Sequence, residues 1–218
     1  MLTLGLDWTS PRLAHVLCLG AHCDDIEIGC GGTIAKLADE HPGLTVSWIV
    51  FTSNEERARE ARKSAETVLE NVKTKEVTIK TLRDGFLPYH GEAVKEMFEE
   101  LKKRVAPDIV FTHYRSDLHQ DHRLISDLTW NTFRDHLVLE YEIPKFDGDL
   151  GSPNVFVHLD AGLRQRKIDN ILSSFQSQRD KRWFTEDTFL ALMRLRGMES
   201  NAPDGYAEAF YCRKLVLG

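Results

Sequence analysis

Histidines and carboxylates follow two apolar segments of this 218-residue chain, at the points where each segment ends. After "LAHVLCL" come His22, Asp24 and Asp25, and after "DIVF" comes "HYRSDLHQDHR", which contains His119 and His122. Such groups are costly to place beside a hydrophobic core unless a positive charge holds them together. A divalent cation would supply that charge.

The spacing of these residues suits a catalytic zinc site. His22 and Asp25 are three positions apart across a tight turn, so both side chains can bend toward one point, and His122 can join them from the second segment. Catalytic zinc takes three imidazole or carboxylate ligands and keeps one position for water. Asp24 and Asp25 are neighbours whose side chains diverge, so one can bind the metal while the other faces the water.

Each motif alone has a simpler structural interpretation. A pair of aspartates after a strand usually caps a helix or lies in a solvated turn. An isolated HxxH pair is more often on the surface than on a metal. Both motifs end strands and offer complementary ligands, which favours the metal. Spacing alone leaves the two interpretations about equally supported.

The elements that must position these residues alternate between strands and helices. Strands are predicted at residues 13–21, 44–52, 76–80, 108–113 and 154–160, and amphipathic helices at 31–40, 55–72 and 93–105. In the last helix Val94, Met97, Phe98, Leu101 and Val105 recur every three or four residues, which gives one apolar face. This alternation predicts an α/β fold with a mostly parallel sheet, whose ligands gather at the carboxyl ends of the strands.

The pattern loosens after residue 137. Residues 141–154 are rich in turn formers and are predicted as a loop. Helices are predicted at 164–184 and 186–197, and a final strand at 206–217. The sequence has no internal repeat, low-complexity tract or clear linker, so one domain spanning residues 1–218 is expected.

Composition limits the partners. The formal net charge is −6 and basic residues are scattered among acidic ones, which argues against nucleic acid. No apolar run approaches the roughly 20 residues that cross a bilayer, and the amino terminus lacks the pattern of a secretory signal, so no membrane partner and a cytoplasmic location are expected. The four cysteines show no disulfide framework and are predicted to be reduced thiols.

The segment "GCGGT" is compared with the dinucleotide-binding pattern GxGxxG. Gly29 and Gly31 fit that pattern, but Ile34 occupies the position of the third glycine. The favoured interpretation is that Gly29, Gly31 and Gly32 let a helix pack close to the sheet.

Two motifs resemble those of the LmbE-like/PIG-L family of metal-dependent N-deacetylases. "AHCDDIEIGCGGTI" resembles the family signature AHPDDxExGxGGT, and "DLHQDHR" resembles its second motif, HPDHR. "FTSNEERAREARKSAETVL", "LRDGFL", "KIDNILSSFQSQ" and "YAEAF" resemble further landmarks in the same order. The resemblance runs from about Leu13 to Phe210 and implies a Rossmann-like single domain that hydrolyses an N-acetyl group on an amino sugar.

The resemblance assigns a metal site. His22, Asp25 and His122 would be the metal ligands, with Zn²⁺ as the expected ion and Fe²⁺ as an alternative. Asp24 would be the general base that activates water. His119 would protonate the leaving amine or stabilise the oxyanion.

The resemblance also assigns supporting residues. Asp121 would hold a histidine in orientation. Arg57 and Asp84 match positions that contact sugar hydroxyls, Tyr206 would approach the oxyanion, and Glu208 would support its loop. The family also implies a homo-oligomer, a trimer or hexamer, although the sequence does not fix the state.

Cys23 and Gln120 replace the prolines of the two motifs. Neither proline is a ligand, so the chemistry should survive with less rigid loops. Two other functions stay open: a metal-dependent phosphoester hydrolase, which would need a second metal with a bridging carboxylate, and a non-catalytic metal-binding assembly protein. The presence of both Asp24 and His119 argues against the latter.

Overall fold

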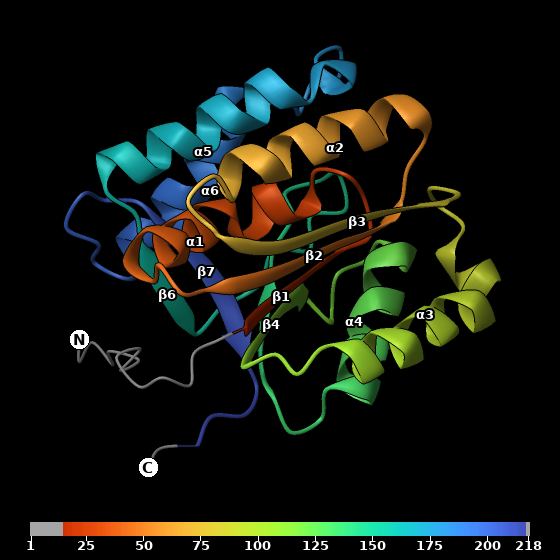
Figure 1. Cartoon of the computed structure of the whole chain (residues 1–218). Helices are drawn as coiled ribbons and strands as arrows, with labels where there is room; N and C mark the ends of the chain where they lie inside the picture. The colour runs from red at the N-terminus through yellow and green to blue at the C-terminus, as the bar shows by residue number, and fades with distance from the viewer. Residues whose placement is uncertain (1–14, 217–218) are drawn as a thin grey trace.

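The computed structural model describes residues 15–216 (Figure 1). The start of the predicted strand 13–21, the end of the predicted strand 206–217 and the segment used for the localisation prediction fall outside this range. The strands are β1 (His15–Gly20), β2 (Thr45–Thr52), β3 (Thr74–Leu82), β4 (Ile109–His113), β5 (Leu137–Tyr141), β6 (Val155–His158) and β7 (Ala207–Cys212). The helices are α1 (Asp25–Glu40), α2 (Glu55–Val68), α3 (Gly91–Arg104), α4 (Gln120–Thr132), α5 (Ala161–Ser174) and α6 (Glu186–Glu199), with short 3-10 helices η1 (Leu87–His90) and η2 (Gln176–Gln178).

All seven strands form one sheet in the order β3-β2-β1-β4-β5-β7-β6. The first five strands pair in parallel, and β7 lies antiparallel between β5 and β6. The predicted α/β fold with a mostly parallel sheet is therefore confirmed. Strands β2 and β3 follow one another outward on one side of β1, and β4 lies on the other side of β1. The carboxyl ends of β1 and β4 thus meet where the strand order reverses, the usual position of a ligand site in such sheets.

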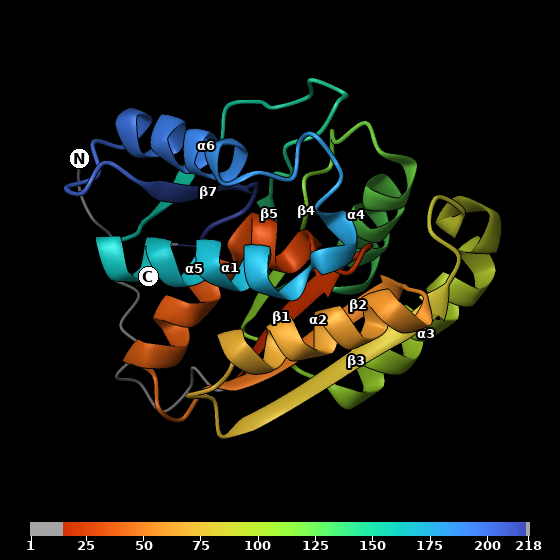
Figure 2. The same cartoon turned by 90° about the horizontal axis from the view of Figure 1, so that it is seen from above.

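Helices cover both faces of the sheet (Figures 1 and 2). Helices α1, α2, α5 and α6 lie on one face, and α3 and α4 lie on the other. Buried apolar side chains form a core cluster under each layer. In α3 the predicted apolar face is present, since Val94, Phe98 and Leu101 are buried. No helix within residues 15–216 combines the length and apolarity that crossing a bilayer requires.

Strand β5 and helix α4 were not predicted, and helices α2 and α5 were predicted too long. Strand β5 is short, and α4 buries polar side chains such as Asp121, His122 and Ser126, so its helical periodicity is not apolar. Helix α5 ends at Ser174, although a helix was predicted to residue 184. The reason is that the backbone N–H and the hydroxyl of Ser177 both donate to Glu60 on α2, which turns the chain away from the helix.

Two of the three glycines of the first motif, Gly29 and Gly32, allow close packing as predicted, whereas a Cβ atom on Gly31 would meet nothing closer than 3.7 Å. A Cβ atom on Gly29 would lie 2.2 Å from the ring of Tyr141, and one on Gly32 would lie 2.7 Å from the side chain of Leu159. Helix α1 therefore approaches the sheet more closely than a side chain at either position would permit.

Candidate functional site

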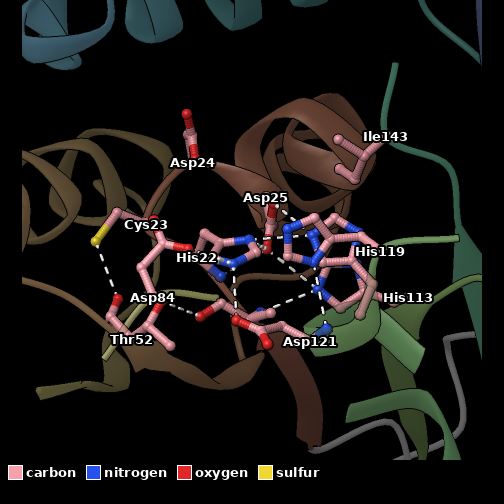
Figure 3. A network of polar contacts seen from close by, with 12 residues as sticks. His22, Cys23, Asp24, Asp25, Thr52, Asp84, His113, His119, Asp121 and Ile143 are labelled. Atoms are coloured by element: carbon pink, nitrogen blue, oxygen red, sulfur yellow. Dashed lines mark hydrogen bonds and ion pairs between the residues drawn. The ribbon is translucent and has the colours of Figure 1, made fainter. Parts of the chain in front are cut away.

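The three predicted metal ligands converge at the carboxyl ends of β1 and β4, and Figure 3 shows His22 and Asp25 there. His22 lies in the turn after β1, Asp25 begins α1, and His122 lies in the first turn of α4 rather than in a loop. His22 Nδ1 is 3.0 Å from His122 Nε2 and 3.2 Å from Asp25 Oδ2. His122 Nε2 is 3.5 Å from Asp25 Oδ1. Two segments about 100 residues apart thus place three ligand atoms around one point.

These separations fit one divalent cation. A tetrahedral ion with ligand bonds of about 2.0–2.1 Å holds its ligand atoms about 3.3 Å apart. The rings of His22 and His122 are inclined at 53°, so their in-plane lone pairs can meet at one point. Without an ion, the 3.0 Å contact between two imidazole nitrogens needs a proton between them. The donor set is two imidazoles and one carboxylate, which suits Zn²⁺ and Fe²⁺ alike.

A neighbouring set, Asp25, His113 and His122, also has three ligand atoms close together. The rings of His113 and His122 are stacked, with centroids 3.9 Å apart and planes within 13°. Their lone pairs therefore run side by side instead of converging, so His113 does not complete a second site. A further set, His22, His119 and His122, contains two of the three predicted ligands and places the imidazole of His119 beside them.

A third set, His22, Asp84 and Asp121, is already engaged in hydrogen bonding. The carboxylate of Asp121 accepts the backbone N–H groups of Gly85 at 2.8 Å and Leu87 at 3.1 Å. Two of the acceptor positions of Asp121 are thus already used by backbone groups, which makes this set a poorer candidate for a second ion.

Each of the two predicted histidine ligands has a carboxylate at its other ring nitrogen. His22 Nε2 lies 3.2 Å from Asp84 Oδ1 and 3.3 Å from Asp121 Oδ2. His122 Nδ1 lies 2.9 Å from Asp117 Oδ2. Such contacts fix the tautomer and raise the basicity of a metal ligand. The contact of Asp121 with a histidine is the one that the family resemblance implied, whereas Asp117 was not assigned a role.

His113 is a second residue that sequence reasoning left unassigned. It ends β4, is fully buried, and its Nε2 accepts the backbone N–H of Ala21 at 2.9 Å. This bond ties the end of β4 to the turn that carries His22. The sequence could have indicated a role for His113, because a histidine at the end of an apolar strand is costly to bury without a partner, like the polar residues after β1.

Charge in the cluster favours a cation. Burial alone would lower the pKa values of His22 and His122, but the charge of Asp25, with hydrogen bonds that the two imidazoles donate to the surrounding carboxylates, raises both. Burial would likewise raise the pKa of Asp25, yet His122 and His22 hold it well below its usual range. Burial and the charge of His122 lower the pKa of His113 to about 4. The site therefore keeps a carboxylate and holds protons where a cation would bind.

Asp24 and Asp25 diverge, as expected for neighbours. Asp24 occupies the N-cap position of α1 but makes no side-chain cap hydrogen bond. In Figure 3 it points away from the His22–Asp25 pair, and Arg57 Nη2 donates to its Oδ1 at 2.8 Å. Both side chains are largely buried. The common role of such a pair, capping a helix, is therefore not what Asp24 does here.

His119 borders the ligand cluster. It is the N-cap residue of α4, and its Nδ1 accepts the backbone N–H of Asp121 at 3.2 Å. Its ring lies edge-on to His22 at a centroid distance of 4.8 Å. Burial and the charges of His122 and His22 lower the pKa of His119. Its tautomer is thus set by the helix backbone, which leaves Nε2 available to a bound molecule.

The remaining predicted residues lie in different places. Asp84 is in the cluster and remains 69% exposed at its side chain. The Cys23 thiol donates to the carbonyl of Thr52, and burial raises the pKa of Cys23 to about 12, so it is a neutral thiol turned away from the ligands (Figure 3). Tyr206 precedes β7, and its ring packs against the guanidinium groups of Arg164 and Arg194 instead of the His22 cluster.

Glu208 does support a structural element. Its carboxylate accepts the backbone N–H groups of Gly32 at 2.8 Å and Thr33 at 2.6 Å, and it pairs with Lys167 Nζ at 2.5 Å. Lys167 also donates to the carbonyl of Ile28 at 2.7 Å. This pair from β7 and α5 therefore holds the middle of α1.

The chain is similar to proteins described as deacetylases. The family model of PIG-L, described as GlcNAc-PI de-N-acetylase, matches residues 17–133. An uncharacterised deacetylase of Escherichia coli K12, YaiS, is 27% identical over 141 residues, which cover 59% of this chain and 74% of that protein.

Solved structures share the fold. The N,N'-diacetylchitobiose deacetylase of Pyrococcus horikoshii superposes with a TM-score of 0.69 at 24% identity, over 92% of this chain and 84% of that one. The 4-carboxy-2-hydroxymuconate hydratase GalB of Pseudomonas putida KT2440 superposes with a TM-score of 0.75 at 16% identity, over 94% and 98% of the two chains. The architecture therefore accompanies more than one reaction, and the site has to select between them.

Proposed function

The chain belongs to the PIG-L family of de-N-acetylases, and from this premise we propose that it is a metal-dependent hydrolase that removes an N-acetyl group from an amino-sugar-containing small molecule. The observation that carries the proposal is the convergence of His22, Asp25 and His122 at 3.0–3.5 Å, the separation that one ion requires. We propose Zn²⁺ as the ion, with Fe²⁺ as the alternative, because the same donors suit both.

When bound there, a divalent cation would polarise the amide carbonyl and make water acidic enough to serve as a nucleophile near neutral pH. The chain's own residues would do the rest. Asp24, which pairs with Arg57 at 2.8 Å, would take the proton from the attacking water. Arg57 would thereby serve both Asp24 and the substrate.

His119 would complete the reaction. A tetrahedral intermediate collapses only when the departing amine receives a proton, and His119 borders the ligands with one ring nitrogen free of backbone contacts. Asp117 and Asp121 would hold His122 and His22 in the correct tautomers. The exposed Asp84 would be available to a sugar hydroxyl.

A two-metal phosphoester hydrolase is less well supported. Within the described part of the chain, the candidate groups beside the first site either stack in parallel or already accept backbone N–H groups. A purely structural metal site would need neither Asp24 nor His119 beside it. Both observations favour amide hydrolysis.

The test is acetate release. The protein is stripped with a chelator, reloaded with Zn²⁺ or Fe²⁺, and assayed against N-acetylglucosamine, its glycosides, nucleotide-linked N-acetylamino sugars and phosphate esters. We expect acetate release that needs the metal. Asp24→Asn should retain the metal and lose at least about 100-fold in kcat/KM. Asp180→Asn, an exposed carboxyl control, should keep full activity. Phosphate release without acetate release would refute the proposal.

A further inference from the structure

Lys145 lies in the irregular segment between β5 and β6, and its side chain is largely buried. Its Nζ lies 2.9 Å from Asp117 Oδ2 and 2.6 Å from Asp149 Oδ2, and the three side chains are 13%, 2% and 6% exposed. Nζ also donates to the carbonyl of Ile143 at 3.4 Å. One ammonium group therefore balances two buried carboxylates.

Both carboxylates hold the backbone that leads to the proposed acid. Asp117 Oδ1 accepts the backbone N–H of His119 at 2.8 Å, and Asp149 Oδ2 accepts that of Leu118 at 2.7 Å. These residues enter α4, whose N-cap is His119. The place of His119 therefore depends on two carboxylates that share Lys145.

Asp117 also contacts a proposed metal ligand. Its Oδ2 lies 2.9 Å from His122 Nδ1 and 2.9 Å from Lys145 Nζ, so the imidazole and the ammonium share one oxygen. Its other oxygen is occupied by the N–H of His119. A carboxylate with donors on both oxygens is held in one orientation. Lys145 is thus linked to His122 through a single side chain.

Anchoring of the loop does not by itself account for Lys145. The ends of residues 142–151 are already held, since Glu142 pairs with Arg196 of α6 through contacts of 2.8 and 2.9 Å. Arg196 also donates to the carbonyl of Gly151 at 3.0 Å, and the N–H of Gly151 donates to Glu142 at 3.2 Å. Fixing a lysine side chain and burying its charge both cost free energy. This cost favours a role for Lys145 in the site that its partners support.

We propose that Lys145 is a positioning residue of the site. Through Asp117 it fixes the orientation of His122 toward the metal, and with Asp149 it fixes the place of His119. The inference rests on the proposed function. Without the ammonium, the Asp117 carboxylate would be free to turn toward water, and His122 would lose the acceptor that fixes its tautomer.

The variant has to separate positioning from charge. Removal of Lys145 alone would add net negative charge near the site, which by itself favours a cation. Lys145→Met combined with Asp149→Asn removes one charge of each sign, and asparagine keeps an oxygen for the N–H of Leu118. Loss of both members of a buried ion pair is often nearly neutral for stability, so this double variant should fold. If it does not, Lys145→Gln with Asp149→Asn, which keeps a polar side chain, takes its place.

The first measurement needs no substrate. Competition with a chelator gives the dissociation constant for Zn²⁺, which should rise about tenfold or more in the double variant. The second measurement is acetate release. We expect kcat to fall about tenfold or more while KM stays within about twofold, because Lys145 acts on residues that bind the metal and move protons.

The matched control is Lys167→Met combined with Glu208→Gln. This change also removes a buried lysine–carboxylate pair, but one that holds the middle of α1. The dissociation constant for Zn²⁺ and kcat should both stay within about twofold of the parent values. Urea denaturation shows whether each double variant is folded under the assay conditions.

Two results would overturn the inference. One is a folded Lys145→Met, Asp149→Asn variant with parental metal affinity and kcat. The other is an equal loss in the Lys167→Met, Glu208→Gln control, which would make the effect one of general stability. If the parent releases no acetate from any substrate, the proposed function is refuted, and the dissociation constants for Zn²⁺ still decide whether Lys145 positions His122.

Discussion

Two buried clusters of charge on α1 differ in how they are balanced. At the first turn of the helix, Asp25 faces two histidines whose nitrogens lie 3.0 Å apart. In the middle of the helix, Glu208 and Lys167 are 2.5 Å apart, and each makes further hydrogen bonds to the backbone of α1. The second cluster is closed, since both ions and the polar backbone groups around them have partners. The first remains open, because its ligand atoms face one another around a point that only a proton or a metal ion can neutralise.

The difference distinguishes buried charges that only stabilise the fold from buried charges that can also bind a ligand. A paired buried charge is costly to break but binds nothing further. Imidazole and carboxylate groups that converge on one point can bind a cation. Four substitutions test this contrast, and the expected effects decrease from the first to the last.

The largest effect is expected from breaking the open cluster with Asp25→Asn. The amide keeps the size of the side chain but removes the anionic ligand, so metal affinity should fall at least about 100-fold and acetate release at least about 1,000-fold. Metal content after dialysis and kcat/KM measure the two losses. Asp169→Asn on the exposed side of α5 is the matched control. Full metal content with full activity would remove Asp25 from the ligand set.

The next effect is expected from breaking the closed pair with Glu208→Gln. This change leaves Lys167, 3% exposed at its side chain, without a counter-ion, and should cost about 3–5 kcal/mol in the free energy of unfolding. Urea denaturation measures the loss, with the exposed Glu186→Gln as control. Metal stoichiometry of the remaining folded protein should not change. A stable variant that has lost the metal would show that the two clusters are not separate.

Glu27 lies between the two clusters, and neither of its carboxylate oxygens has a hydrogen-bond partner. Burial, reinforced by the charges of Asp24 and Asp25, raises its pKa from 4.5 to about 8, and the Ser64 hydroxyl opposes the shift without forming an aligned hydrogen bond. The folded protein therefore keeps a proton that the unfolded chain has lost. The resulting stabilisation is complete below pH 4.5 and disappears as the pH rises through about 8.

Glu27→Gln should abolish this pH dependence. With metal-free protein, the variant should match the parent near pH 5 and exceed it by up to about 4 kcal/mol near pH 9. Urea denaturation at several pH values measures the difference, with the exposed Glu66→Gln as control. A stability difference that stays constant over this pH range would show that Glu27 is ionised in the folded protein.

The smallest effect is expected from Gln120→Pro, which leaves the charges of both clusters in place. Gln120 is the first residue of α4, where proline is tolerated, and His119 before it is extended at φ −71° and ψ 125°, as a residue before proline must be. Stability should rise by about 0.4–1 kcal/mol, less the lost contact of Gln120 with Gly85. Asn131→Pro, inside the same helix, should instead cost about 3 kcal/mol. Urea denaturation distinguishes the two, and a destabilised Gln120→Pro would contradict the assigned start of α4.

Local pattern predicted much of this molecule. Strands such as β2 and β4 are buried on both faces and therefore appear as apolar runs. Helix α3 has a periodic apolar face. Helix α4 escaped prediction because the residues it buries, among them Asp121 and Thr129, are polar and serve the site. Because the buried face of this helix is polar, the sequence lacks the apolar periodicity from which a helix is predicted.

Long-range partners were the part that sequence could not provide. The proposed metal ligands could be named from motifs, but the pairing of Asp117 with Lys145 depends on two separate segments meeting. Likewise, Arg57 was expected to contact a sugar hydroxyl, whereas its partner in the structure is Asp24. Such contacts follow from the order of strands in the sheet, which no short motif encodes.

The position of strand β7 in the sequence determines when the sheet can be completed during synthesis. Strand β7 is the last strand along the described chain, yet it lies between β5 and β6, and it carries the carboxylate that closes the ion pair on α1. A nascent chain that has not yet extended past Ala207–Cys212 leaves the edge of β5 unpaired and Lys167 without its counter-ion. Residues through Cys212 must therefore be synthesised before the helix that begins with Asp25 is held by its ion pair.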